Sequence, residues 1–196
     1  VLLVYQGTYH APGPHPPELK VVAGLTAFGL AQFTYYLGRS HPNNLYHICI
    51  PSLVLAALER FRVTDLMLVP TMIQMTVDHP AMAKPRDLSA LRTIIYGASP
   101  IAEAVLDRAM AALPGVGFVQ AYGMTELSPV ATVNPARNHT IEGRKLGKLR
   151  AAGRASYGAE VRIVDANDQE LPRGTVGEVV VRGPNVMRGY WNKPEQ

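Results

Sequence analysis

The first candidate site is a run of seven residues that brings an aromatic ring, a hydroxyl and a carboxylate together. Its members are Gln120, Ala121, Tyr122, Gly123, Met124, Thr125 and Glu126. They follow a short apolar run, Phe118 and Val119, which is typical of the end of a buried strand. Tyr122 could stack on a nucleobase, Thr125 could donate to a phosphate oxygen, and Glu126 could hold a Mg²⁺ ion that bridges phosphates. An ordinary strand-to-loop turn with a solvated glutamate explains the same residues.

A second segment, Gly97, Ala98, Ser99 and Pro100, follows another predicted strand, residues 93–96. Ser99 is suited to cap a helix and Pro100 to begin it, so the sequence predicts a helix from there to about residue 112. A strand over residues 117–120 comes next. Strand, helix and strand at this spacing predict parallel strands, whose carboxyl ends would bring the two segments into one ligand-binding crevice.

Further elements place these segments in an α/β fold, with a mostly parallel sheet, flanking helices and a small antiparallel β-rich subdomain at the end. We expect a helix over residues 53–62 capped by Ser52, a strand over 65–69, and a helix over 72–79 that stops at Pro80. Short alternating strands are expected over 159–165 and 177–182. The predicted domains are an atypical, disrupted segment (1–51), a nucleotide-binding α/β subdomain (52–152) and the β-rich subdomain (153–196).

Residues 127–150 show no clear pattern of helix or strand. His139 and the basic group Arg144, Lys145, Lys148 and Arg150 could face phosphates, but a solvated surface is the interpretation favoured for them.

The amino-acid composition indicates which kinds of ligand the protein could bind and which cellular compartment it suits. The net charge of +4 without a dense Lys/Arg run is compatible with anionic ligands but indicates no nucleic acid. A single cysteine, Cys49, fits a reducing, cytoplasmic compartment, and the six scattered histidines indicate no structural zinc site. The uncharged run 21–38 reaches the length of a membrane span, but its glycines, Gln32 and hydroxyl residues favour a buried hairpin or helix.

The five residues from Tyr122 to Glu126 resemble the central Tyr-Gly-x-Thr-Glu motif of the adenylate-forming superfamily. That superfamily includes acyl-CoA synthetases, firefly-type luciferases and the adenylation domains of peptide synthetases. Two further matches lie in the expected order, Gly97 to Pro100 upstream and Gly177-Glu178 through Gly189-Tyr190 downstream. The resemblance covers about residues 52–196, and it assigns the downstream match a structural role.

The resemblance implies ATP-dependent activation of a carboxylic acid as acyl-AMP, followed by transfer to CoA. It implies ATP, Mg²⁺ and CoA as cofactors, with Tyr122 stacked on adenine and framed by Gln120 and residues 97–100. Thr125 would touch the α-phosphate and Glu126 would hold the Mg²⁺, which makes these two the catalytic candidates. Met124 and the Gly-Ala-Ser-Pro segment look more like acyl-CoA synthetases than peptide-synthetase domains, and a medium or long fatty acid is the favoured substrate. Residues that would flank the carboxylate pocket are Thr71, Ile73 and Gln74.

The chain also departs from the family pattern. The phosphate loop, rich in Ser, Thr and Gly, has no counterpart: residues 3–10 keep an apolar strand and one Gly-Thr and then diverge. Residues 6–50 are interpreted as a disrupted or a divergent version of that region. The ribose-binding Asp, the hinge and the C-terminal catalytic Lys are not found either, so the chain is expected to be a fragment with little activity of its own. The alternatives are a nucleotide-binding remnant without turnover, a peptide-synthetase adenylation domain, and a membrane-associated protein that uses residues 21–38.

Overall fold

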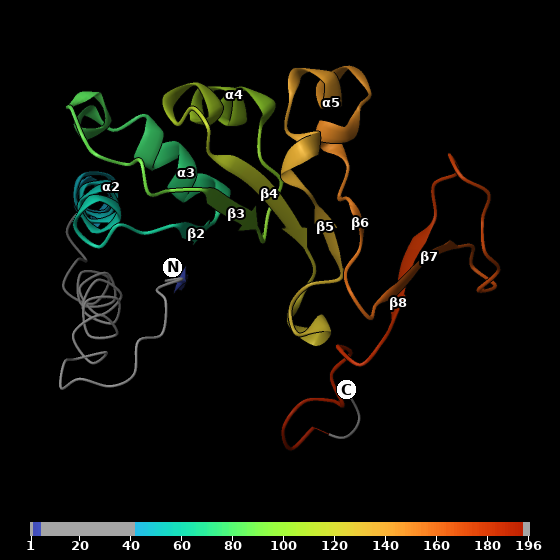
Figure 1. Cartoon of the computed structure of the whole chain (residues 1–196). Helices are drawn as coiled ribbons and strands as arrows, with labels where there is room; N and C mark the ends of the chain where they lie inside the picture. The colour runs from blue at the N-terminus through green and yellow to red at the C-terminus, as the bar shows by residue number, and fades with distance from the viewer. Residues whose placement is uncertain (1, 5–41, 194–196) are drawn as a thin grey trace, which may run out of the picture. The chain divides into compact units, whose positions relative to one another are not determined.

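The chain folds into two compact units. A computed structural model describes residues 2–4 and 42–193, and it divides the chain into Val1–Phe118 and Val119–Gln196 (Figure 1). The boundary between the units falls inside strand β4, whereas the sequence pattern places the change to a β-rich subdomain near residue 153.

The strands of the first unit are held together in one sheet. Strand β2 (Asp65–Leu68) pairs with β3 (Thr93–Gly97) in parallel, and β1 (Leu2–Val4) pairs with the other edge of β2 in the antiparallel direction. Leu66 lies opposite Ile94 in the parallel pair, and both side chains are buried. The predicted strands at 65–69 and 93–96 are therefore confirmed to within one residue, and these two strands pair in parallel.

Among the residues that the structure describes, three α-helices accompany this sheet: α2 (Pro42–Arg60), α3 (Pro70–Val77) and α4 (Glu103–Ala112). A short 3-10 helix, η1 (Pro80–Ala83), follows α3. Helix α3 packs against both α2 and α4, as Figure 1 shows. Each helix buries at least one side chain almost completely: Leu55 in α2, Ile73 in α3 and Leu106 in α4. Each of these residues lies on the inward, apolar face of its helix.

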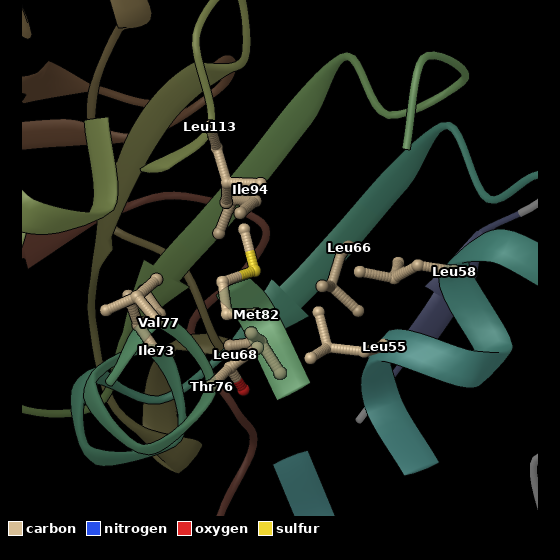
Figure 2. A pocket seen from close by; sticks show the side chains of 10 residues that line it. All are labelled: Leu55, Leu58, Leu66, Leu68, Ile73, Thr76, Val77, Met82, Ile94 and Leu113. Carbon is tan, nitrogen blue, oxygen red and sulfur yellow. The ribbon is translucent and has the colours of Figure 1, made fainter. Parts of the chain in front are cut away.

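The core of the first unit surrounds a small apolar cavity (Figure 2). Its lining comes from α2, β2, α3, η1, β3 and the residue after α4: Leu55, Leu58, Leu66, Leu68, Ile73, Thr76, Val77, Met82, Ile94 and Leu113. A volume of about 10 Å³ is barely enough for one water molecule, and apolar cavities of this kind stay dry. The cavity is a feature of core packing and is too small to hold a ligand.

Three helix boundaries differ from the sequence prediction. Ser52 does not cap a helix, because α2 begins at Pro42 and continues through Pro51. Pro51 has no backbone N–H to donate within the helix, and burial of its ring in the core offsets this lost hydrogen bond. Helix α3 begins at Pro70, which occupies its first turn, and ends three residues before Pro80. Helix α4 begins at Glu103 rather than at Pro100, because the backbone is still extended at Ala102.

The second unit contains antiparallel strand pairs that the sequence did not reveal. Strand β4 (Gly117–Tyr122) pairs with β5 (Thr132–Asn134), and β5 pairs with β6 (Arg154–Ala155). The connection from β5 to β6 forms three short helices, η3 (Ala136–Asn138), α5 (Ile141–Lys145) and η4 (Lys148–Arg150).

Asn134 holds this connection in place from a fully buried position at the end of β5. Its Nδ2 donates to the carbonyl oxygens of Lys148 at 2.9 Å and Ala151 at 3.0 Å. Its Oδ1 accepts from Asn138 Nδ2 at 2.7 Å. Because both ends of the amide are hydrogen-bonded, burial of this polar side chain stabilises one arrangement of the loop.

The last elements are β7 (Glu160–Val164) and β8 (Glu178–Arg182), which form the predicted antiparallel pair and lie side by side in Figure 1. Val161 lies opposite Val181, and Ile163 lies opposite Val179. The α/β class with a small antiparallel sheet near the end is therefore confirmed.

Within residues 2–4 and 42–193, none of the helices combines the length and the hydropathy needed to cross a membrane. The uncharged run at residues 21–38 lies outside the described residues. So does the region after β1 that the sequence analysis compared with the family's phosphate loop.

Candidate functional site

Residues 97–100 form an exposed turn at the carboxyl end of β3. Gly97 is half-buried as the last residue of the strand, and Ala98, Ser99 and Pro100 are exposed. Ala98 has a φ of +68°, in the left-handed region that costs a non-glycine residue roughly 1–2 kcal/mol. Such conformations cluster at ligand-binding sites, where the surrounding structure maintains them. Ser99 and Pro100 lie in this turn and not in α4, so their predicted helix-starting roles are wrong, while their predicted position beside a strand end is confirmed.

The second segment begins inside the sheet of the second unit. Strand β4 continues two residues further than predicted, so Gln120, Ala121 and Tyr122 pair with Asn134, Val133 and Thr132 of β5. The Tyr122 carbonyl also accepts from the amide of Ala131 at 2.8 Å. The Tyr122 side chain remains 40% exposed. A firmly held backbone therefore presents an open aromatic face, which suits stacking on a planar base.

Gly123 allows the chain to leave the strand beside the loop that returns to β5. A Cβ atom at this position would stand 2.0 Å from the carbonyl oxygen of Pro129, so only glycine fits. The close backbone approach at Gly123 is therefore to the protein's own loop. Met124 continues in an extended conformation with an exposed side chain.

Thr125 and Glu126 stand on a single 3-10 turn, η2 (Thr125–Leu127). The side chain of Leu127 is buried and anchors this turn, and the Leu127 amide donates to the Met124 carbonyl at 3.0 Å. The Thr125 side chain is exposed, and Glu126 is partly exposed. A hydroxyl and a carboxylate therefore both reach solvent from one short, anchored turn.

The Glu126 carboxylate accepts a hydrogen bond from the Tyr190 hydroxyl through Oε1. This bond and a bond from the residue's own backbone amide hold the pKa of the Glu126 carboxyl below its usual range, with a smaller opposing effect of desolvation. The same contact raises the pKa of the Tyr190 phenol. Glu126 is therefore ionised at neutral pH and Tyr190 is protonated. The sequence did not identify Tyr190 as part of a site, although the Gly189-Tyr190 pair belonged to the third motif.

The donor set at Glu126 fits a Mg²⁺ ion that arrives with phosphates. No group of three or more His, Cys, Asp or Glu residues that could hold a metal occurs among the described residues. Mg²⁺ is commonly bound through one or two carboxylates, with phosphate oxygens and waters completing its octahedron. A carboxylate has about four lone-pair positions, so the Tyr190 and backbone contacts leave room for a metal.

The residues expected to flank a carboxylate pocket separate in the structure. Ile73 is 1% exposed and lines the small apolar cavity of Figure 2, so its assignment to a substrate pocket is wrong and it belongs to the core. Thr71 and Gln74 lie together on the outer side of α3, in an open depression of about 370 Å³ that also includes Asp78 and His79. Helical periodicity explains this separation, because positions 71 and 74 share a face that position 73 does not.

His139 is buried, so the solvated surface favoured for it in the sequence analysis is wrong. Its ring Nδ1 is 3.1 Å from the carbonyl of Pro135, and burial lowers the pKa of the imidazole. The basic residues Arg144, Lys145, Lys148 and Arg150 are all exposed, as the favoured interpretation predicted.

The structure thus brings Tyr122, Thr125, Glu126 and Tyr190 together within the second unit. Residues 97–100 belong to the first unit. The convergence of the two segments on one ligand stays a prediction.

Comparison with known proteins identifies the family. The model of the family described as "AMP-binding enzyme" matches residues 31–191. The chain belongs to this family, and the predicted membership in the adenylate-forming superfamily, in its acyl-CoA synthetase branch, is confirmed.

Three relatives illustrate the match. A feruloyl-CoA synthase of Amycolatopsis is 42% identical over 149 residues, which are 74% of this chain and 28% of that protein. The medium/long-chain-fatty-acid–CoA ligase FadD8 of Mycobacterium tuberculosis is 37% identical over 183 residues, 93% of this chain and 31% of that protein. The solved structure of the amide bond synthetase McbA from Marinactinospora thermotolerans matches with a TM-score of 0.66 at 38% identity, and the match covers 74% of this chain and 28% of that one. The chain therefore spans 28–31% of the length of these relatives.

The family match also begins earlier than expected. It includes residues 31–51, which the sequence analysis had placed in a disrupted segment. The hypothesis that residues 1–51 form a disrupted segment stays a prediction.

Proposed function

We propose that this chain forms the nucleotide-binding part of an ATP-dependent acyl-CoA ligase. In the proposed reaction, a carboxylate oxygen of the acid attacks the α-phosphorus of ATP, and the bond to pyrophosphate breaks to leave acyl-AMP. The CoA thiol then loses its proton, attacks the acyl carbon and releases AMP. The observation that carries the proposal is the anchored turn with Thr125 and Glu126, directly after the exposed ring of Tyr122, within a chain that belongs to the AMP-binding enzyme family.

The first step requires no general base, because the attacking carboxylate is already ionised. The protein must instead hold two anions in line and offset their charge. We assign adenine stacking to Tyr122 and a hydrogen bond to the α-phosphate to the Thr125 hydroxyl. Glu126 would hold Mg²⁺, which supplies charge neutralisation at the phosphates when bound. Gln120 and residues 97–100 would frame the base.

A fatty acid is the proposed substrate, and the match to the fatty-acid–CoA ligase over 93% of the chain supports it. The 42% identity to a feruloyl-CoA synthase favours an aromatic acid as the second candidate. The single cysteine of the sequence supports a cytoplasmic location. Since the chain spans about three tenths of its relatives, we propose that it catalyses little ATP–pyrophosphate exchange alone.

Glu126→Gln tests the proposal, because it removes the charge that would hold Mg²⁺ and keeps the side-chain shape. We expect binding of ATP in the presence of Mg²⁺, measured by calorimetry, to weaken at least about tenfold, as expected for the loss of a metal ligand. The melting temperature should change little, because the side chain is partly exposed.

Glu178→Gln is the matched control, since it makes the same change at an exposed glutamate of β8. It should bind Mg·ATP like the unmodified chain. Equal affinity of the Glu126→Gln variant and the unmodified chain would remove Glu126 from the site and overturn the proposed function.

A further inference from the structure

A short segment near the end of the described chain makes repeated contact with the η2 turn. This segment, residues 185–190, is called the clasp. Asn185 Nδ2 donates to the carbonyl of Leu127 at 3.0 Å, and the amide of Met187 donates to the carbonyl of Glu126 at 2.8 Å. The Tyr190 hydroxyl donates to the Glu126 carboxylate. The clasp therefore holds the turn by its backbone at two consecutive residues and by the side chain of one of them.

We propose that Tyr190 is a positioning residue that orients the Glu126 carboxylate toward a divalent metal, with the clasp fixing the turn beneath it. This inference rests on the proposed role of Glu126 as a Mg²⁺ ligand. Tyr190 itself touches neither metal nor nucleotide in this account. It acts through Glu126.

The geometry explains why a free glutamate would be a poorer ligand. A glutamate side chain loses conformational entropy when it is fixed, and an exposed one samples several rotamers. The bond from Tyr190 to Oε1 selects one orientation before the metal arrives, and the bond from Met187 fixes the backbone of the same residue. Carboxylates that bind metals are usually held in this way by outer hydrogen-bond partners, and loss of such a partner typically costs 10–100-fold in metal affinity.

The clasp is also built to approach the turn closely. A Cβ atom at Gly183 would stand 2.6 Å from Asn185 Oδ1, so the absence of a side chain there leaves room for the Asn185 amide. The Asn185 Nδ2 atom also donates to the carbonyl oxygen of Val130 at 3.4 Å. Asn185 thus connects the clasp to both ends of the segment that follows Glu126.

Tyr190→Phe tests the inference because it removes one hydroxyl and keeps the ring. We expect the Mg²⁺ concentration that gives half-maximal ATP binding, measured by calorimetry, to rise about tenfold, the low end of the usual effect of an outer partner. ATP binding in EDTA should be unchanged. A merely structural role would weaken both measurements together. Tyr157→Phe is the control, since Tyr157 is fully exposed, and it should leave the Mg²⁺ midpoint unchanged.

A double variant that combines Tyr190→Phe with Glu126→Gln distinguishes a failure of this inference from a failure of the proposed function. If Tyr190 acts through the carboxylate, adding Tyr190→Phe to Glu126→Gln should produce no further rise in the Mg²⁺ midpoint. If Glu126→Gln raises the midpoint and Tyr190→Phe does not, the positioning role is overturned and the proposed function stands. If Glu126→Gln has no effect, the proposed function itself fails. A Tyr190→Phe variant that loses ATP binding equally in EDTA would also overturn the positioning role.

Discussion

Two residues of the candidate site have a fixed local geometry. Glu126 is hydrogen-bonded to the clasp through its backbone carbonyl and its carboxylate. Ala98 occupies the left-handed region without being a glycine. Fixed, accessible groups of this kind suit a site that must position two anions, because little reorganisation is required when the ligands bind.

The conformation of Ala98 predicts opposite effects of two substitutions on the stability of the protein. Ala98→Val should lower the free energy of unfolding by roughly 1–3 kcal/mol, because a β-branched side chain at positive φ is strained. Ala98→Gly removes that strain and should leave the stability unchanged or slightly raised. Urea unfolding of both variants measures the difference. Equal stability of the two variants would show that Ala98 does not hold a left-handed conformation in solution.

The sequence predicted the chemistry of the site better than its geometry. Tyr122, Thr125 and Glu126 could be chosen because their side chains have recognisable chemical roles next to a strand end. Tyr190 could not be connected to Glu126, since 64 positions separate them and only the folded chain brings them together. Ser99 and Pro100 carried good helix-start signals, but the extended backbone up to Ala102 delays α4 until Glu103.

At the scale of elements, the longer strands were predicted well and the very short ones were not. β2, β3, β7 and β8 each have four or five residues, and apolar side chains make up more than half of each. β5 and β6 have three and two residues, which is too short for periodicity to be visible. Their positions depend instead on buried hydrogen bonds such as those of Asn134, which the sequence does not display.

His139 makes the segment from η3 to α5 sensitive to acid. Burial lowers the pKa of His139 from its ordinary value of 6.5, so the unfolded chain takes up the proton first as the pH falls. The stability linked to His139 is complete above the unfolded pKa of about 6.5 and is lost below it, by at most about 1.4 kcal/mol per pH unit until the folded pKa is reached.

We therefore expect the melting temperature of the unmodified chain to fall more between pH 7.5 and 5.5 than that of His139→Gln. Glutamine cannot be protonated in this range and can still donate toward the Pro135 carbonyl, which lies 3.1 Å from the ring nitrogen. The difference between the two pH values is the relevant quantity, because the substitution can change the stability at both. Parallel losses in the two proteins would show that His139 does not titrate between folded and unfolded states.

At the scale of the whole molecule, three motifs in one order were enough to predict the family. The match over residues 31–191 confirms it, and it includes residues whose composition had set them apart from the family. The nucleotide proposal uses residues 97–100 from one unit and residues 120–126 from the other. Its central claim is that both segments bind the same molecule of ATP.

Titration of the isotope-labelled chain with Mg·ATP, followed by NMR, tests this claim most directly. The amide signals of Ala98 and Tyr122 should both shift and should yield the same Kd, because one bound nucleotide would perturb both. Shifts confined to one of the two amides, or two different Kd values, would contradict the account.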